Sequence, residues 1–184
     1  MTKAKKVYTV SPIPGRGMAL IATTAIPVGK RIIGEKPVVS LTDGEKIADK
    51  AHLFTNCAMS LANSYPDHPD VVGIFYTNCI GRPGSDRISD LCVRISRANH
   101  SCRPSAMYSW NDSLQKEVLY AVRPIWEGDE ITVEYNAHTD DFDADRQHLF
   151  DTWGFQCDCR MCMEATPSYK EMYNRYPSVI EDIL

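Results

Sequence analysis

The sequence has no apolar run long enough to cross a bilayer and no excess of positive charge. A membrane-spanning helix needs roughly 18 to 20 apolar residues, and proline or charged residues interrupt the longest apolar stretches here. The formal net charge is −4 at pH 7, so the chain lacks the basic stripe that nucleic-acid-binding proteins use. We therefore expect neither a membrane span nor direct nucleic-acid binding, whereas an acidic surface favours a lysine-rich peptide partner.

The N-terminus also lacks the charged and apolar leader of a secreted protein, and no internal repeat or low-complexity linker is present. We therefore expect an intracellular protein, nuclear or cytoplasmic, in which disulfides are rare. The chain has 184 residues, of which 43% are hydrophobic and 24% are charged. This size and composition suit one globular domain with a sizeable core and a small appendage.

Short β-like stretches outnumber helical ones, which predicts a mostly β fold with few helices. Residues 7–10 and 18–22 are expected to form a hairpin around a tight turn at 12–17. Further strands are predicted from Ile- and Val-rich or alternating segments at residues 31–35, 38–41 and 131–135. Residues 106–110 and 117–122 are expected to form a second hairpin around a turn at Asn111 and Asp112.

Three helices are predicted. Thr42 and Glu45 resemble a capping box, followed by Ile47, Ala51, Phe54, Ala58 and Leu61 at helical spacing. A second helix is expected at residues 143–153, capped by Asp143, with Leu149, Phe150 and Trp153 on its apolar face and Asp145, Arg146 and Gln147 on its polar face. A third, short helix is expected at residues 168–176.

Three of the seven cysteines form a C-x-C-x-x-C run near the C-terminus, at Cys157, Cys159 and Cys162. Three closely spaced thiols leave a tetrahedral metal one ligand short. Cys102 supplies the fourth ligand if the run folds back onto the segment Asn99–Cys102. Four cysteine thiolates are a set that zinc takes in closed structural sites, so we predict one structural zinc ion on these four residues.

Other interpretations of the cysteines are less well supported. Cys159 and Cys162 form a C-x-x-C that is compatible with a redox pair, but this stretch does not resemble the βαβ unit in which such pairs sit. The odd number of cysteines and the absence of a leader argue against disulfides. Cys57, Cys79 and Cys92 stand singly among apolar residues, so we expect small buried hydrophobes there.

Three further motifs precede the cysteine run, at Pro14–Leu20, Asn99–Pro104 and Gly128–Tyr135. Each motif alone is weak evidence for a function, because such segments are usually ordinary turns, hydrogen-bonded polar pairs in a core, or turns that lead into strands. The ordered set resembles a SET domain with a post-SET zinc motif. Asn-His-Ser-Cys and the phrase Trp153–Cys159 are similar to the SET-and-MYND-domain methyltransferases and their fungal SET relatives. The MYND module itself is expected to be absent, because residues 43–69 hold one cysteine.

The resemblance implies the SET-domain β-fold, with small antiparallel sheets and a threaded crossing of the strand ending at Tyr135 past the Asn-His segment. Such threading is an exception to the rule that chains are unknotted. By the same resemblance, residues 7–138 form the SET domain, with a helical insert at 43–69. Residues 139–166 form a post-SET zinc-binding region, and residues 167–184 form a C-terminal helical tail.

The resemblance also implies a protein-lysine N-methyltransferase that uses S-adenosylmethionine and acts on a lysine of a histone or another protein. A neutral amine attacks the methyl carbon in line, so positioning matters more than acid–base chemistry. A dry channel and the sulfonium cation both lower the pKa of the lysine, so no dedicated base is required. The alternative is a catalytically weak or inactive SET-like binding module for peptides or partner proteins. A thiol hydrolase using His100 and Cys102 ranks third, because zinc would occupy Cys102.

Residue roles follow from the same resemblance. Tyr135 is the expected catalytic residue, whose hydroxyl lies beside the transferring methyl group and orients the amine. With Trp153 it is expected to line the lysine channel. Because Phe155 precedes Cys157 by two residues, zinc binding should order both the cofactor pocket and this channel. The expected cofactor contacts are Arg16, Gly17, Asn78, Asn99, His100, Tyr135 and Phe155.

Overall fold

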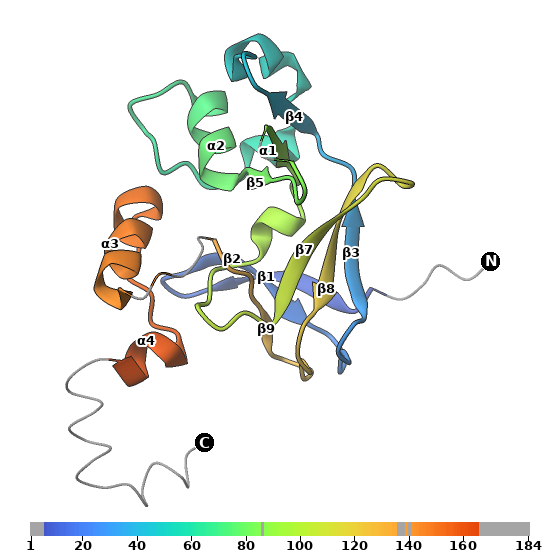
Figure 1. Ribbon diagram of the computed structural model, residues 1–184, viewed down its shortest axis with the longest axis vertical. Helices are drawn as coiled ribbons and strands as arrows, with labels where there is room; N and C mark the ends of the chain where they lie inside the picture. Colours follow the sequence, from blue (N-terminus) through green and yellow to red (C-terminus); the bar gives the residue numbers. More distant parts are fainter. Residues whose placement is uncertain (1–5, 86, 136–138, 140, 166–184) are drawn as a thin grey trace, which may run out of the picture. The chain divides into compact units, whose positions relative to one another are not determined.

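The computed structural model describes residues 6–85, 87–135, 139 and 141–165 (Figure 1). The chain divides into two compact units: the first comprises residues 1–100 and 104–133, and the second comprises residues 101–103 and 134–184. The helix predicted at residues 168–176 and the predicted tail at 167–184 lie outside the described residues. Where the structure is described, no helix combines the length and apolar character needed to cross a membrane.

The described part of the first unit contains three antiparallel sheets of three strands each, in the orders β1-β2-β9, β3-β8-β7 and β4-β6-β5. This arrangement of small antiparallel sheets with few helices confirms the predicted fold class. The strands are β1 Tyr8–Ile13, β2 Gly17–Ala22, β3 Arg31–Glu35, β4 Val39–Thr42, β5 Ile80–Gly81, β6 Ile88–Leu91, β7 Ala106–Asn111, β8 Lys116–Ala121 and β9 Glu130–Ile131.

Both predicted hairpins are present. In the first, β1 and β2 pair from Tyr8 opposite Ala22 to Ile13 opposite Gly17. The turn between them contains Gly15 at φ +74°, and Gly17 follows at φ +69°. Glycine adopts this left-handed conformation without a steric penalty, so the turn requires both. In the second hairpin β7 pairs with β8 along their full length, as the alternating sequence predicts.

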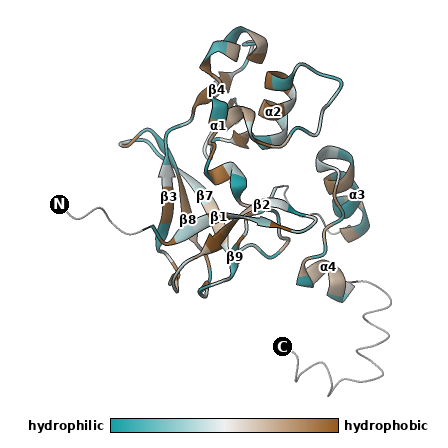
Figure 2. Cartoon of the chain, turned by 180° about the vertical axis from the view of Figure 1, so that it is seen from behind, coloured by the Kyte–Doolittle hydropathy of each residue, from teal (hydrophilic) through white to brown (hydrophobic). Residues whose placement is uncertain are grey.

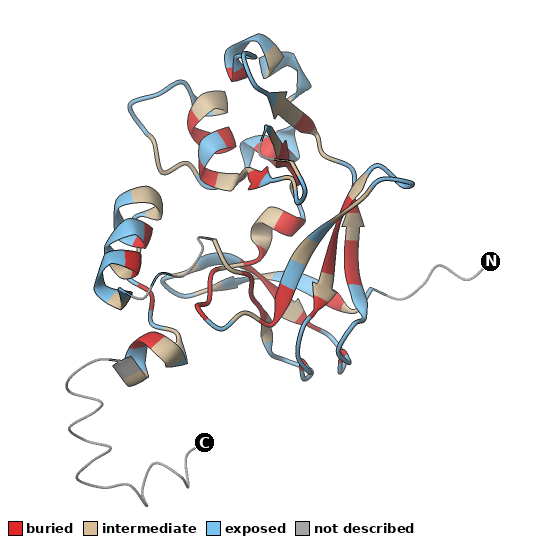
Figure 3. Cartoon of the chain, in the orientation of Figure 1, coloured by how far each residue is buried: buried red, intermediate tan, exposed pale blue. Residues whose placement is uncertain are grey.

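Buried residues are concentrated along β3, β8 and the last two turns of helix α2 (Figure 3). The sequence pattern did not predict α2, which spans Asp70–Asn78. Its Val, Ile, Phe and Tyr residues have high strand propensity. Tertiary packing stabilises the helix instead, because Ile74 and Phe75 lie in a buried cluster with Val39, Ile47, Ala58, Leu61 and Leu91.

The single helix predicted after Thr42 is wrong. The Glu45 carboxylate does accept a hydrogen bond from the Thr42 amide at 2.8 Å, as in half of a capping box. The following residues, however, form a 3₁₀ helix η1 at Ile47–Leu53 and a one-turn helix α1 at Asn56–Met59. Because the helix is interrupted between these two segments, Ala51 is exposed, although the sequence pattern placed it on the buried face of one continuous helix.

The strand predicted at residues 131–135 is shorter than expected, since β9 ends at Ile131. Val133 forms an isolated parallel bridge with His100, and its amide donates a hydrogen bond to the Asn99 carbonyl at 3.0 Å. The segment leading to Tyr135 therefore runs beside the Asn-His segment, as the expected crossing requires. Tyr135 itself lies in a bend.

Two sheets of the first unit share a polar junction around the buried Asp90 of β6. Arg82 donates hydrogen bonds to both carboxylate oxygens of Asp90, at 2.8 and 2.9 Å. The Arg82 guanidinium also lies 3.7 Å from the ring centroid of Trp110 on β7. Paired, bidentate contact of this kind offsets the cost of burying a carboxylate. Arg82 therefore links the β4-β6-β5 sheet to the β3-β8-β7 sheet.

In the second unit, helices α3 and α4 span Phe142–Trp153 and Arg160–Ala165. The predicted cap Asp143 is wrong: Asp141 caps α3 by accepting hydrogen bonds from the amides of Asp143 and Ala144. Two predictions about its faces are also wrong. Asp145 is buried, because it accepts hydrogen bonds from the amide and hydroxyl of Thr139, and Phe150 is exposed.

Candidate active site and zinc site

The structure brings the four predicted zinc ligands together in the second unit. The Cys102 Sγ lies 3.4 Å from the Cys162 Sγ and 3.8 Å from the Cys157 Sγ. All four sulfurs, including that of Cys159, lie within 4.8 Å of one another. A tetrahedral zinc site with Zn–S bonds of about 2.3 Å has sulfurs about 3.8 Å apart. The spacing of these thiols therefore suits a tetrahedral all-cysteine site.

Crowding sets the ionisation of these thiols. Hydrogen bonding from Cys157 lowers the pKa of Cys159, because neighbouring thiols stabilise one thiolate. The pKa of Cys157 is raised, first by its hydrogen bond to Cys159 and then by burial, while burial is the main cause that raises the pKa of Cys102 and Cys162. A bound divalent cation would offset the repulsion between neighbouring thiolates and so allow all four thiols to ionise. The chemistry of the donor set thus fits zinc.

Next to the thiols lie three rings that we call the aromatic group: Tyr135, Trp153 and Phe155. The ring centroids of Tyr135 and Trp153 are 5.1 Å apart, and those of Tyr135 and Phe155 are 6.3 Å apart in an edge-to-face arrangement. All three rings pack against the buried cluster of Cys102, Leu149, Cys157 and Cys162. The side chains expected to line the lysine channel and to contact the cofactor therefore share one small core with the predicted metal ligands.

Gly154 explains how the sequence Trp-Gly-Phe builds this group. The residue ends α3 at φ +75°, and its amide donates a hydrogen bond to the Phe150 carbonyl at 2.8 Å. This is the left-handed glycine cap that commonly ends a helix. The turn brings Phe155 to the same side as Trp153 and leads the chain to Cys157.

In the first unit, a second set of predicted residues is joined by hydrogen bonds. We call Arg16, Asn99, His100 and Glu130 the polar network. The Arg16 guanidinium donates to the His100 carbonyl at 3.1 Å. The Asn99 amide nitrogen donates to the Arg16 carbonyl at 3.3 Å and to the Glu130 carboxylate at 2.8 Å. Arg16 and Glu130 also form an ion pair at 3.5 Å. The β1–β2 turn is thereby tied to the Asn-His segment and to β9.

Gly17 has the turn role that the sequence predicts, and Asn78 has a structural role that the sequence did not indicate. A Cβ added at Gly17 would meet no atom within 4 Å, so its positive φ, and not crowding within the chain, calls for glycine. The Asn78 amide nitrogen donates to the carbonyls of Ala62 and Ile74, both at 2.7 Å. Those bonds lie at the last residue of α2, and no bond joins Asn78 to the polar network among the described residues. Its role as a cofactor contact stays a prediction.

Two residues beside the predicted set were missed. Glu130 is part of the Gly-Asp-Glu motif but had no assigned role, although a charged residue directly before the apolar start of the strand predicted at residues 131–135 was a usable signal. His148 packs its ring edge-to-face with Trp153 at a centroid distance of 5.9 Å. The two residues are five positions apart, which is not the three or four of neighbours on a helix face, so no sequence pattern indicated this contact.

Comparison with known families decides between a chance set of motifs and a true relationship. The family model for the SET domain matches residues 17–136, which is more than half of the chain. The chain belongs to the SET domain family. The predicted boundaries of the SET domain, the post-SET region and the tail stay predictions.

Among curated proteins, this SET-domain chain is 33% identical over 168 residues to the histone-lysine N-methyltransferase set5 of Schizosaccharomyces pombe, covering 85% of this chain and 50% of that protein. It is 34% identical over 104 residues to a SET and MYND domain-containing protein of Dictyostelium discoideum, covering 50% of this chain and 30% of that protein. It is 29% identical over 104 residues to the N-lysine methyltransferase SMYD2 of Rattus norvegicus, covering 53% of this chain and 24% of that protein. The chain thus spans half the length, or less, of these relatives.

Proposed function

We propose that this SET domain is a protein-lysine N-methyltransferase that uses S-adenosylmethionine. The observation that carries the proposal is the aromatic group of Tyr135, Trp153 and Phe155, held against the four thiols in one core. Aromatic faces attract cations and exclude water, and methyl transfer needs such an environment. The names of the relatives, which are histone-lysine or N-lysine methyltransferases, support the same reaction class.

Tyr135 is the proposed catalytic residue. When bound, S-adenosylmethionine supplies a methyl group on a positively charged sulfur. Tyr135 bears the hydroxyl of the aromatic group, so it orients the substrate amine by a hydrogen bond. The neighbouring Trp153 and Phe155 rings exclude water, which lowers the pKa of the lysine and favours the neutral amine that attacks. Positioning by these rings, without a dedicated base, is then sufficient for transfer.

The polar network is the proposed holder of the amino-acid end of the cofactor. That end carries a carboxylate, which accepts hydrogen bonds, and an ammonium group, which donates them. Arg16 has a guanidinium, which is suited to carboxylates, and the amide of Asn99 retains an oxygen that accepts hydrogen bonds. The residues present therefore match the charges of the group that they would bind. We also assign Gly17, His100 and Asn78 to cofactor binding on the family resemblance.

Zinc is the proposed occupant of the four-thiol site, and its role is structural. All four ligands come from protein side chains, and three of them are buried, which is typical of closed zinc sites without a water position. Since Tyr135, Trp153 and Phe155 pack on these cysteines, the metal would keep the aromatic group in place. The thiol of Cys102 lies in this cluster, so a hydrolase that uses Cys102 as nucleophile is not supported.

The partner that we propose is a lysine-containing protein or peptide, histone or non-histone. A test is a peptide array incubated with the chain and radiolabelled S-adenosylmethionine. Label on lysine peptides is expected, and Tyr135→Phe should reduce transfer by roughly 10²-fold or more, because the lost hydroxyl acts in the transition state. Tyr76→Phe is the matched control, because Tyr76 is exposed on α2 and should transfer at the wild-type rate.

Two outcomes would contradict the proposal. Binding of S-adenosylmethionine without transfer to any lysine peptide would instead support the alternative, a SET-like module that binds peptides or partner proteins. Equal activity of wild-type protein and Tyr135→Phe would show that the reacting groups lie elsewhere.

A further inference from the structure

Glu130 is the one acidic side chain of the polar network, and it contacts two of the proposed cofactor-binding residues at once. One carboxylate oxygen accepts a hydrogen bond from the Asn99 amide nitrogen at 2.8 Å. The other lies 3.5 Å from the Arg16 guanidinium. The Glu130 side chain is 18% exposed, so water screens these contacts less than those of a surface pair. Pairing of β9 with β2, in which Glu130 lies opposite Ile21, fixes its backbone.

The hydrogen bonds decide which way the Asn99 amide faces. A carboxylate only accepts hydrogen bonds, so Glu130 attracts the nitrogen of the amide and not its oxygen. The same nitrogen also donates to the Arg16 carbonyl at 3.3 Å. Both amide hydrogens are thus used within the network. The Asn99 Oδ1 remains as an acceptor, and no described residue donates a hydrogen bond to it.

We propose that Glu130 is a positioning residue for cofactor binding: it orients Asn99 so that Oδ1 accepts a hydrogen bond from the α-ammonium group of S-adenosylmethionine. Glu130 also keeps the Arg16 guanidinium beside the His100 carbonyl, to which Arg16 donates at 3.1 Å. It acts through Asn99 and Arg16 without touching the cofactor. This inference rests on the proposed function, because it assumes that S-adenosylmethionine binds to the polar network.

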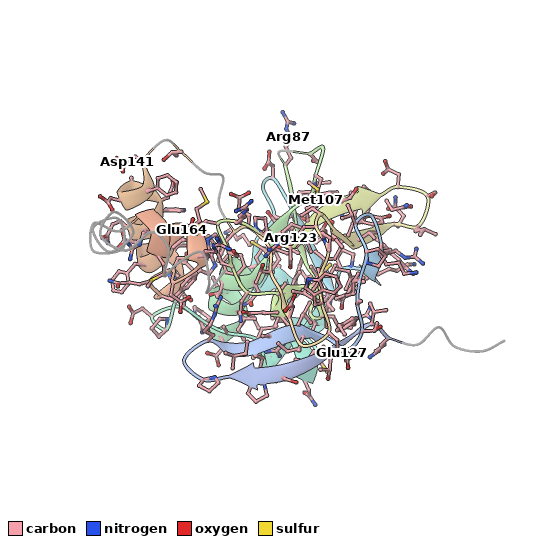
Figure 4. All side chains as sticks on the ribbon, turned by 90° about the horizontal axis from the view of Figure 1, so that it is seen from below. Arg87, Met107, Arg123, Glu127, Asp141 and Glu164 are labelled. Carbon is pink, nitrogen blue, oxygen red and sulfur yellow. The ribbon has the colours of Figure 1, made fainter. Side chains whose placement is uncertain are left out.

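The test is calorimetric titration of the zinc-loaded chain with S-adenosylmethionine. Glu130→Ala should raise Kd roughly tenfold, which is the effect of losing one hydrogen bond to a charged group. Glu127→Ala is the matched control, because it changes the net charge equally three residues away. Glu127 is exposed and lies in the turn that precedes β9, where Figure 4 labels it. Its substitution should leave Kd within about twofold of the wild-type value.

Two further measurements separate positioning from a general structural effect. Methylthioadenosine lacks the whole amino-acid end of the cofactor, so wild-type protein and Glu130→Ala should bind it equally. A double-mutant cycle combines Glu130→Ala with Asn99→Ala. The second substitution should raise Kd for S-adenosylmethionine by less than about a further twofold, because both substitutions remove the same interaction. In turnover assays, KM for S-adenosylmethionine should rise while kcat and KM for the peptide stay unchanged.

Several outcomes would overturn the assignment. These are unchanged Kd in Glu130→Ala, an equal loss in Glu127→Ala, an equal loss for methylthioadenosine, or additive losses with Asn99→Ala. If Glu130→Ala unfolds, Glu130→Gln keeps the volume and one acceptor oxygen, and it should still raise Kd for S-adenosylmethionine but not for methylthioadenosine. Failure of the wild-type chain to bind S-adenosylmethionine would instead refute the proposed function, so the two failures are distinguishable.

Discussion

The two units are stabilised by different means. The first buries large apolar side chains in and around its sheets, among them Phe75, Leu91, Leu119 and Ile131. In the described part of the second, Leu149 is the one fully buried aliphatic residue, and three cysteines complete its core. Its helix α3 is predominantly hydrophilic (Figure 2). A region too small to gather an apolar core needs another source of stability, which the proposed zinc ion would supply.

The largest expected effect is loss of the folded structure of the second unit alone. Verified removal of zinc, or Cys159→Ser, should abolish methyl transfer, because the aromatic group packs on the ligand cysteines. Hydrogen exchange should become fast in α3 and α4 while β3 and β8 stay protected. The matched control is Cys57→Ser, which changes an exposed cysteine outside the cluster. Retained turnover after complete loss of zinc would show that the second unit is stable without metal.

The next effect is confined to the first unit. Phe75→Ala removes a fully buried ring of α2 and should lower the free energy of unfolding by about 3–5 kcal/mol in urea. Tyr76→Ala, at an exposed position of the same helix, should cost less than about 1 kcal/mol. Zinc content per folded molecule should not change in either variant. A loss of zinc in Phe75→Ala would show that the two units do not behave separately.

Glu117 of β8 gives the first unit a dependence on pH. This carboxyl is fully buried, and no described residue donates a hydrogen bond to its oxygens. Burial, followed by repulsion from Asp90, raises the pKa of Glu117 from 4.5 to about 7. The folded state therefore binds the proton more tightly than the unfolded state. The resulting stability is fully present below pH 4.5 and is lost as the pH rises through about 7.

Glu117→Gln should remove this dependence. Between pH 4.5 and 8 the free energy of unfolding of the wild type should fall by about 3 kcal/mol more than that of the variant, because one pKa unit corresponds to about 1.4 kcal/mol. Urea unfolding at several pH values measures the difference. Glu127→Gln, at an exposed position, is the control and should follow the wild-type profile. If Glu117→Gln has the same pH dependence of unfolding as the wild type, the Glu117 carboxyl is not the cause of that dependence.

The smallest expected effect concerns the second unit, at the end of α3. Gly154→Ala should destabilise the second unit by about 1 kcal/mol, because φ is +75° and an added Cβ meets no atom, so only backbone strain acts. Zinc affinity should fall about fivefold accordingly. Gly81→Ala in β5, where an added Cβ also meets no atom and φ is not positive, should leave zinc affinity unchanged. Equal zinc affinity in Gly154→Ala would refute the role of this cap.

Local sequence patterns were sufficient to predict the secondary structure of much of the chain. Strand β3 coincides with the predicted residues 31–35, and the β7–β8 hairpin matches to within one residue at each end. Such strands depend on alternation between neighbouring positions, which the sequence displays directly. The four clustered cysteines could be named for a similar reason, since thiols have few other uses in such spacing. The roles of Tyr135 and Asn78 came from the family resemblance and stay predictions.

By itself, the sequence determined the family, the fold class and which four cysteines come together. Tertiary structure alone decided that Asp70–Asn78 is helical, because burial of Phe75 and Ile74 outweighs strand propensity. It alone revealed Glu130 as the partner of Asn99, 31 residues away. The physical reason is the same in both cases: periodicity and composition report interactions between near neighbours, whereas burial and hydrogen bonds between distant segments exist only once the chain has folded.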